Sequence, residues 1–69
     1  MSEELSQEVV GAIGRVSVPI SDGRPGEVMI PIRGGVEAYQ ALADEEITKN
    51  SRVVVVEIIS GRTVLVTPY

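Results

Sequence analysis

The chain of 69 residues contains no cysteine and no histidine. Their absence excludes disulfides, thiolate nucleophiles, imidazole bases and the usual zinc ligands. The single lysine, Lys49, lies in a polar segment, where nothing would desolvate its amine and make it a base for a serine. The acidic run 44–46 and the glycine-rich turns match neither a calcium loop nor a phosphate-binding loop. We therefore expect no enzyme activity, no bound metal and no cofactor.

Aromatic residues and positive charge are also scarce. Phenylalanine and tryptophan are absent, Tyr39 and Tyr69 are the two tyrosines, and ten acidic residues outnumber six basic ones for a net charge of −4. Nucleic-acid sites combine a basic surface with stacking aromatics, and anionic lipid attracts basic segments, so this balance argues against both partners. No run approaches the roughly 18 apolar residues of a membrane span, and we expect no signal peptide.

The strongest structural signal lies in residues 51–68. Two runs rich in β-branched residues, 53–59 and 63–67, flank a short break that contains a glycine. β-Branched side chains suit a pleated, half-buried surface, and a short glycine-containing break between two such runs predicts a β-hairpin. The alternation in the second run places Val64 and Val66 in the core.

The first run of this hairpin cannot alternate strictly. If Val53 and Val55 point inward, Glu57 points inward as well, and an unpaired carboxylate in a thin core is costly. A bulge of one residue near Val55–Val56 would change the facing of the residues that follow it. We therefore predict that Val56 and Ile58 face the core and that Glu57 faces outward.

Three further strands are predicted at residues 9–20, 27–32 and 36–43. Turn-forming residues separate them at 21–26 and 33–35. Residues 36–43 also favour helix by propensity, and their place between breaks is what indicates a strand. The residues expected to face inward in the first two strands are Val16, Val18, Ile20, Val28, Ile30 and Ile32.

Single residues in this pattern indicate local geometry. Glycines inside a strand mark a bulge, a bend or a close backbone approach, which we expect at Gly11 and Gly14. Proline cannot donate to a strand ladder, so Pro31 is expected at an edge or a bulge. The polar connection 44–51 has one apolar anchor, Ile47. Five short strands joined in this way favour a small barrel, because closure removes exposed edges.

The predicted final hairpin leaves apolar side chains on its outer face, at Val54, Ile59 and Leu65. A contiguous exposed apolar patch marks an interface, whereas scattered exposed aliphatic residues are ordinary. We predict a candidate protein-interaction surface made of these three residues and flanked by the loops of Arg24 and Arg33. The alternative is that the N-terminal segment folds over these residues.

Residues 11–68 resemble the C-terminal soluble domain of the NfeD-like membrane protein family. The matching features, in chain order, are Gly11-x-x-Gly14, the run from Arg24 to Val28, the pair Gly34-Gly35, Tyr39-x-Ala41, Ile47, Val53-x-Val55-Val56, Gly61 and Val64-x-Val66-x-Pro68. One departure is Asn50, where the family usually carries glycine; asparagine tolerates the same left-handed backbone better than most residues. The turn at residues 60–62 is slightly longer than the common form.

The resemblance implies a fold, a setting and a partner. The fold would be an OB-fold, a five-stranded Greek-key β-barrel, over residues 10–69, with residues 1–9 as an N-terminal tail or linker. Full-length family members carry transmembrane helices upstream, so we expect the soluble domain of a membrane-associated protein, on the cytoplasmic side. The implied role is non-enzymatic scaffolding or protein interaction with flotillin- or stomatin-like partners at membrane microdomains.

Two other functions are alternatives to this role. Small five-stranded barrels often bind single-stranded nucleic acid, which makes such binding the main alternative despite the acidic balance. Residues 28–33 loosely resemble swapped-hairpin transcription regulators, which are DNA-binding dimers. The net charge of −4 argues against that class too.

Overall fold

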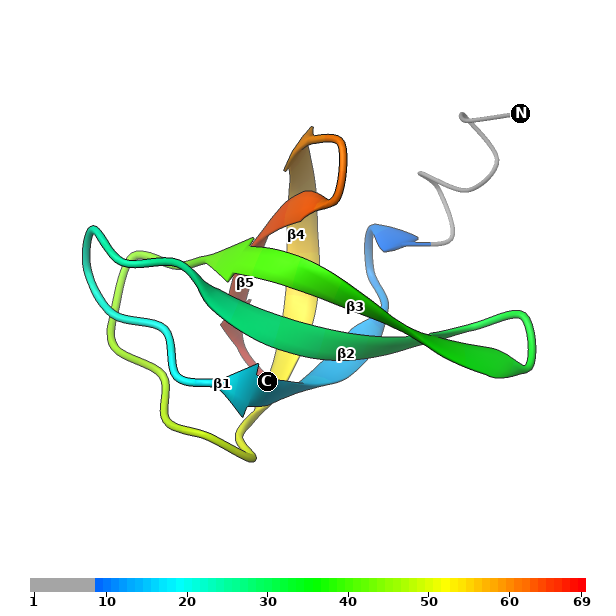
Figure 1. Ribbon diagram of the computed structural model, residues 1–69, viewed down its shortest axis with the longest axis horizontal. Coiled ribbons are helices and arrows are strands. Elements are labelled where there is room, and N and C mark those ends of the chain that lie inside the picture. Colours follow the sequence, from blue (N-terminus) through cyan, green and yellow to red (C-terminus); the bar gives the residue numbers. More distant parts are fainter. Residues whose placement is uncertain (1–8) are drawn as a thin grey trace.

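Five strands close into a barrel in the computed structural model, which describes residues 9–69 (Figure 1). The strands are β1 (Ile13–Val18), β2 (Gly26–Ile32), β3 (Gly35–Leu42), β4 (Arg52–Ser60) and β5 (Thr63–Pro68). They follow the order β1-β2-β3-β5-β4 around the barrel, with β3 and β5 parallel and the other neighbouring pairs antiparallel. This topology confirms the predicted all-β class and the five-stranded Greek-key OB-fold.

An entirely aliphatic core fills the barrel. The buried residues are Val9, Val16, Ile20, Val28, Ile30, Ala41, Ile47, Val53, Val55, Val64 and Val66. Within residues 9–69 no polar or charged residue is buried, so apolar packing and the closed strand ladder hold the domain together. Of the predicted tail, residues 1–8 lie outside the described residues, whereas Val9 packs in the core.

The β2–β3 hairpin follows strict alternation. Its pairing runs without a shift from Gly26 opposite Ala41 to Ile32 opposite Gly35. Val28 and Ile30 are fully buried and Ile32 packs against the core, as predicted. The two-residue turn at Arg33–Gly34 has φ values of 50° and 79°, which suit the right-handed twist of the flanking strands. The strand predicted for residues 36–43 is confirmed as β3.

In β1 the prediction for Val18 is wrong. The register shifts between Val16 and Val18, which lie opposite Val28 and Glu27. A bulge places an extra residue on one strand and reverses the alternation after it. Val16 is therefore buried, whereas Val18 is 47% exposed. Beyond the strand, Ile20 returns to the core, as predicted.

The connection from residue 43 to residue 51 crosses the end of the barrel and is anchored as predicted. Ile47 is buried and exchanges two backbone hydrogen bonds with Ile20, at 2.8 and 2.9 Å. Asn50 has a φ of 76°, which confirms the left-handed backbone expected there. Its backbone N–H donates to the Val16 carbonyl at 2.7 Å, which fixes the connection against β1.

Two glycines allow neighbouring strands to approach closely. A Cβ atom at Gly14 would lie 2.7 Å from the backbone oxygen of Met29, which confirms the close approach predicted at this glycine. Gly26 does not lie in a turn as expected, but opens β2. A side chain there would collide with the carbonyl oxygens of Val18 and Pro19.

The β4–β5 hairpin contains the predicted bulge and a second irregularity. The register shifts between Val55 and Glu57, and Glu57 faces outward, both as predicted. The prediction for Val56 is wrong, because this valine is the extra residue of the bulge and is 49% exposed. Ile58 packs against the core, as predicted, and a second shift lies between Ile58 and Ser60.

Candidate protein-interaction surface

The residues of the predicted surface do not all lie together. Val54, Ile59 and Leu65 share the β4–β5 hairpin and face away from the core. Arg24 belongs to the turn before β2 and Arg33 to the turn after it, and these turns lie at opposite ends of β2 (Figure 1). The structure therefore brings the three aliphatic residues onto one hairpin and separates the two arginines.

Pairing across four strands extends the apolar surface beyond the residues predicted from the sequence. Ile13 of β1 lies opposite Val54 of β4, and Leu42 of β3 lies opposite Leu65 of β5. Val56 stands between Val54 and Leu65, on the outer face just before the bulge. We call these five outward-facing residues the apolar belt: Ile13, Leu42, Val54, Val56 and Leu65. Sequence reasoning missed three of them, because their positions depend on the parallel β3–β5 pair, on the β1–β4 pair and on the position of the bulge.

A pocket of about 300 Å³ lies at the β5 side of this belt. Its walls come from both strands of the last hairpin and from the loop after β3, and its lining residues are Asp44, Glu45, Val56, Leu65, Val66, Thr67 and Pro68. The volume is at the lower end of the range for small-molecule sites, about 300–1,000 Å³. It therefore suits one or two aliphatic side chains better than a cofactor.

Charge is distributed unevenly around the belt. Two carboxylates, Asp44 and Glu45, stand at the pocket, and no basic residue lines it. On the far side, Arg15 lies directly opposite Arg52 across the β1–β4 pair, an arrangement that is unfavourable for like charges. Arg15 Nη1 donates to the Asn50 carbonyl at 3.4 Å. The belt thus has an acidic border beside β5 and a basic border beside β1.

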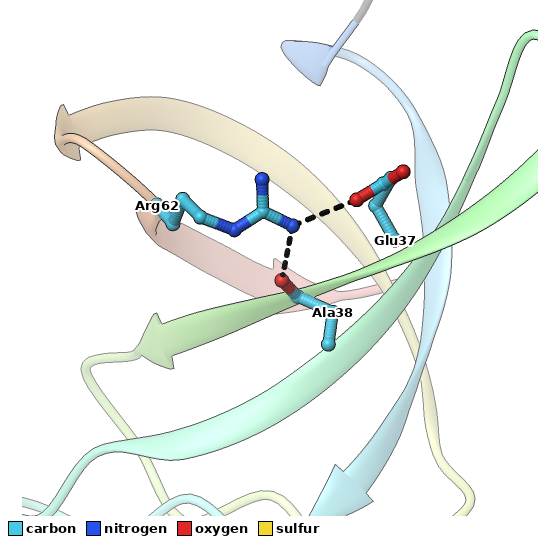
Figure 2. Close-up of polar contacts among 3 residues, drawn as sticks. All are labelled: Glu37, Ala38 and Arg62. Atoms are coloured by element: carbon cyan, nitrogen blue, oxygen red, sulfur yellow. Dashed lines mark hydrogen bonds and ion pairs between the residues drawn. The ribbon is translucent and has the colours of Figure 1, made fainter.

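The exposed edge of β3 is partly occupied by the β4–β5 turn (Figure 2). Arg62 Nη2 donates to the Ala38 carbonyl oxygen at 2.9 Å and to Glu37 Oε1 at 2.8 Å. The same guanidinium lies 4.7 Å from the centre of the Tyr39 ring, within cation–π range. This cluster joins the two hairpins and covers one of the backbone acceptors on the β3 edge.

The opposite edge of the β2–β3 hairpin is blunted by a proline. The Ala38 carbonyl points away from β2. The backbone N–H and C=O of its direct partner Met29 therefore point away from β3. Two residues further along, Pro31 occupies the same kind of position and has no N–H to offer. Both edges of this hairpin are therefore poor templates for an added strand.

The outer face of β2 and β3 is where OB-folds commonly contact oligonucleotides. In this chain the outward residues of the two strands are Glu27, Met29, Pro31, Val36, Ala38 and Gln40. They include one acidic residue, no basic residue and no aromatic ring. Tyr39, which alternates with these residues, packs against the core instead. This face offers neither the charge nor the stacking that single-stranded nucleic acid requires.

Residues 9–69 offer neither a metal site nor a membrane-spanning helix. No group of three or more histidine, cysteine, aspartate or glutamate side chains is placed to hold a metal ion. No helix in this part of the chain has the length and apolar character needed to cross a membrane. The apolar belt and its pocket are thus the site with the clearest chemical character in the described part of the chain.

Comparison with known proteins places the chain among characterised domains. Residues 13–67 match the sequence profile of the NfeD C-terminal domain. The chain is 28% identical to the soluble domain of the NfeD protein YuaF from Bacillus subtilis, with a TM-score of 0.79 over 97% of this chain and 84% of that one. It is 27% identical to the C-terminal domain of a stomatin operon partner protein from Pyrococcus horikoshii, with a TM-score of 0.72 over 93% and 92%.

A third structure supports the fold alone. It is the soluble domain of a Corynebacterium glutamicum membrane protein implicated in regulation of membrane protease activity, with 17% identity and a TM-score of 0.64 over 91% of this chain and 95% of that one. No curated protein sequence gives a significant match.

Proposed function

The chain belongs to the NfeD C-terminal domain family, and we propose that it is a non-enzymatic interaction domain that binds a stomatin- or flotillin-like protein. The observation that carries the proposal is the likeness to the Pyrococcus horikoshii domain, whose protein is described as a stomatin operon partner. That likeness extends over nearly the whole of both chains, so it concerns the domain itself.

The chemistry of the chain supports a binding role. Histidine, the most frequent general base, and cysteine, a strong nucleophile near neutral pH, are absent from the sequence. The described surface instead offers the apolar belt with a pocket on one side. An apolar surface bordered by charge is typical of a site that recognises another protein.

We further propose the setting that the family resemblance implies. The domain is held near a membrane by transmembrane helices elsewhere in its protein, on the cytoplasmic side, and acts as a scaffold at membrane microdomains. Such tethering raises the effective concentration of a membrane-bound partner, so a weak direct interaction suffices.

The test is direct binding between the purified chain and a stomatin- or flotillin-like protein from the same organism. We expect saturable binding in the micromolar range, measured by biolayer interferometry with the chain immobilised. An unrelated OB-fold domain of similar net charge serves as the control for adsorption. Absence of binding at about 100 μM, with both proteins folded by circular dichroism, contradicts the proposal.

A further inference from the structure

We infer that the pocket beside the apolar belt receives an aliphatic side chain from a partner segment that also carries lysine or arginine. This inference rests on the proposed function and deepens it, because it names the chemistry of the segment that would be bound. Three features of the surface carry it: the floor of the pocket, its border and the blocked strand edges.

The floor of the pocket is formed by two aliphatic side chains of the last hairpin. Alternation from the buried Val55 turns Val56 outward beside Leu65, and the bulge then turns Glu57 outward as well. Val56 is therefore 49% exposed in a domain whose core is thin. An aliphatic side chain from a partner would remove both residues from water.

The border of the pocket selects the charge of the partner. Asp44 and Glu45 line it, and Glu57 lies opposite Leu65 on the same outer face. Such exposed carboxylates add little to the stability of the domain itself, but they attract and orient cations over about one Debye length, roughly 10 Å at 0.1 M salt. A lysine or arginine next to the aliphatic anchor of the partner complements this border.

The mode of docking follows from the blocked edges. Pro31 and Arg62 obstruct the two edges of the β2–β3 hairpin, so the partner meets side chains on an outer face and does not add a strand. The apolar belt crosses four neighbouring strands, a width of roughly 14 Å at about 4.8 Å per strand. A short segment is therefore enough to cover it.

The first experiment uses three short fluorescein-labelled peptides with the full chain, followed by fluorescence anisotropy at about 50 mM salt, where charge contacts are strong. One peptide carries leucine flanked by lysines, the second has glutamates in place of the lysines, and the third has serine in place of the leucine. We expect the first to bind at least about tenfold more tightly than either of the others. Equal affinities, or no binding of the first at about 1 mM, overturn the inference.

Matched variants of the chain locate the site. Val56→Thr removes apolar surface from the pocket, whereas Val36→Thr makes the same change at a valine that is 59% exposed on the β2–β3 hairpin. We expect a loss of affinity of about fivefold for Val56→Thr and none for Val36→Thr. Asp44→Lys is expected to weaken binding about tenfold and to flatten its salt dependence, while Asp22→Lys in the exposed turn before β2 does neither.

The same variants separate this inference from the proposed function. Suppose that the stomatin- or flotillin-like partner binds the unaltered chain, Val56→Thr and Asp44→Lys equally well. The pocket is then not its site, and the inference fails while the proposed function stands. If that partner does not bind at all, the proposed function fails. The peptide preference and its loss in Val56→Thr then still decide the inference by themselves.

Discussion

The two hairpins of this barrel differ in the regularity of their strand pairing. They also differ in the apolar surface that each one leaves on the outside of the barrel. The β2–β3 hairpin pairs without interruption, buries Val28 and Ile30 in the core and has both edges obstructed. The β4–β5 hairpin contains two register shifts and carries Val56 on its outer face beside Leu65. Both of its strands have aliphatic residues on two faces, so some of these residues remain outside the core. The irregular hairpin is therefore the one that carries the candidate interaction surface.

The largest expected effect tests the regular hairpin. Gly26→Ala places a Cβ atom against the carbonyl oxygens of Val18 and Pro19, and backbone cannot move aside cheaply. We expect a loss of about 3 kcal/mol in the free energy of unfolding, measured by urea unfolding with circular dichroism. A domain of this size has only about 3–5 kcal/mol, so the variant would retain at most about 2 kcal/mol of stability.

Gly35→Ala in the same hairpin is the matched control. The nearest atom to its Cβ would be the Ile32 carbonyl oxygen at 3.8 Å, an ordinary contact. We expect a change within about 0.5 kcal/mol. Equal losses at Gly35 and Gly26 would mean that close strand approach is not the reason for the glycine at position 26.

The next effect tests the bulge through two adjacent valines. Val55 is 1% exposed and Val56 is 49% exposed. We expect Val55→Ala to lower the free energy of unfolding by about 2 kcal/mol and Val56→Ala by less than about 0.5 kcal/mol. Thermal and urea unfolding of both variants would check this. The reverse order would show that the bulge lies one residue away, with Val56 inward as the sequence analysis predicts.

A smaller effect is expected just before the irregular hairpin, at Asn50. Its φ of 76° is costly for residues with an ordinary side chain. We expect Asn50→Ala to destabilise the domain by about 1 kcal/mol, while Asn50→Gly stays within about 0.5 kcal/mol of the unaltered chain. The melting temperatures of the two variants measure the difference. A stable alanine variant would indicate that the turn rearranges.

The smallest effect concerns the contact that joins the two hairpins. Arg62 and Glu37 form an exposed ion pair at 2.8 Å. A double-mutant cycle with Arg62→Ala and Glu37→Ala should give a coupling energy of about 0.5 kcal/mol, weaker in high salt. Arg62→Ala alone should cost more than Glu37→Ala, because it also removes the contacts with Ala38 and Tyr39. Equal single effects would leave the ion pair as the only contact of consequence.

Local chemistry predicted much of this fold. A lone apolar residue in a polar connection indicated that Ile47 is an anchor, and the tolerance of asparagine for left-handed backbone predicted the geometry of Asn50. A buried charge is costly, so Glu57 implied a bulge whose position is confirmed. Each of these inferences needed only a residue and its immediate neighbours.

Two of the errors come from bulges. Val18 was expected inward because alternation alone does not reveal the bulge in β1, and Val56 because the sequence does not say which residue of the bulge in β4 is the extra one. That choice depends on how neighbouring strands twist and pack. The predicted surface combined Arg24 and Arg33 with the last hairpin, but the length of β2 separates the two turns. Distances between loops are not encoded in any short stretch of sequence.

The sequence by itself determined that this protein is a small aliphatic β-barrel without the usual catalytic groups, because strand alternation, turn chemistry and missing residue types are local properties. Only the tertiary structure decided that Leu42 meets Leu65 and that Asp44 and Glu45 stand beside Val56. These contacts follow from the parallel closure of β3 on β5 and from the bulge in β4. Closure and bulge position depend on packing around the whole ring, so no single strand could reveal them.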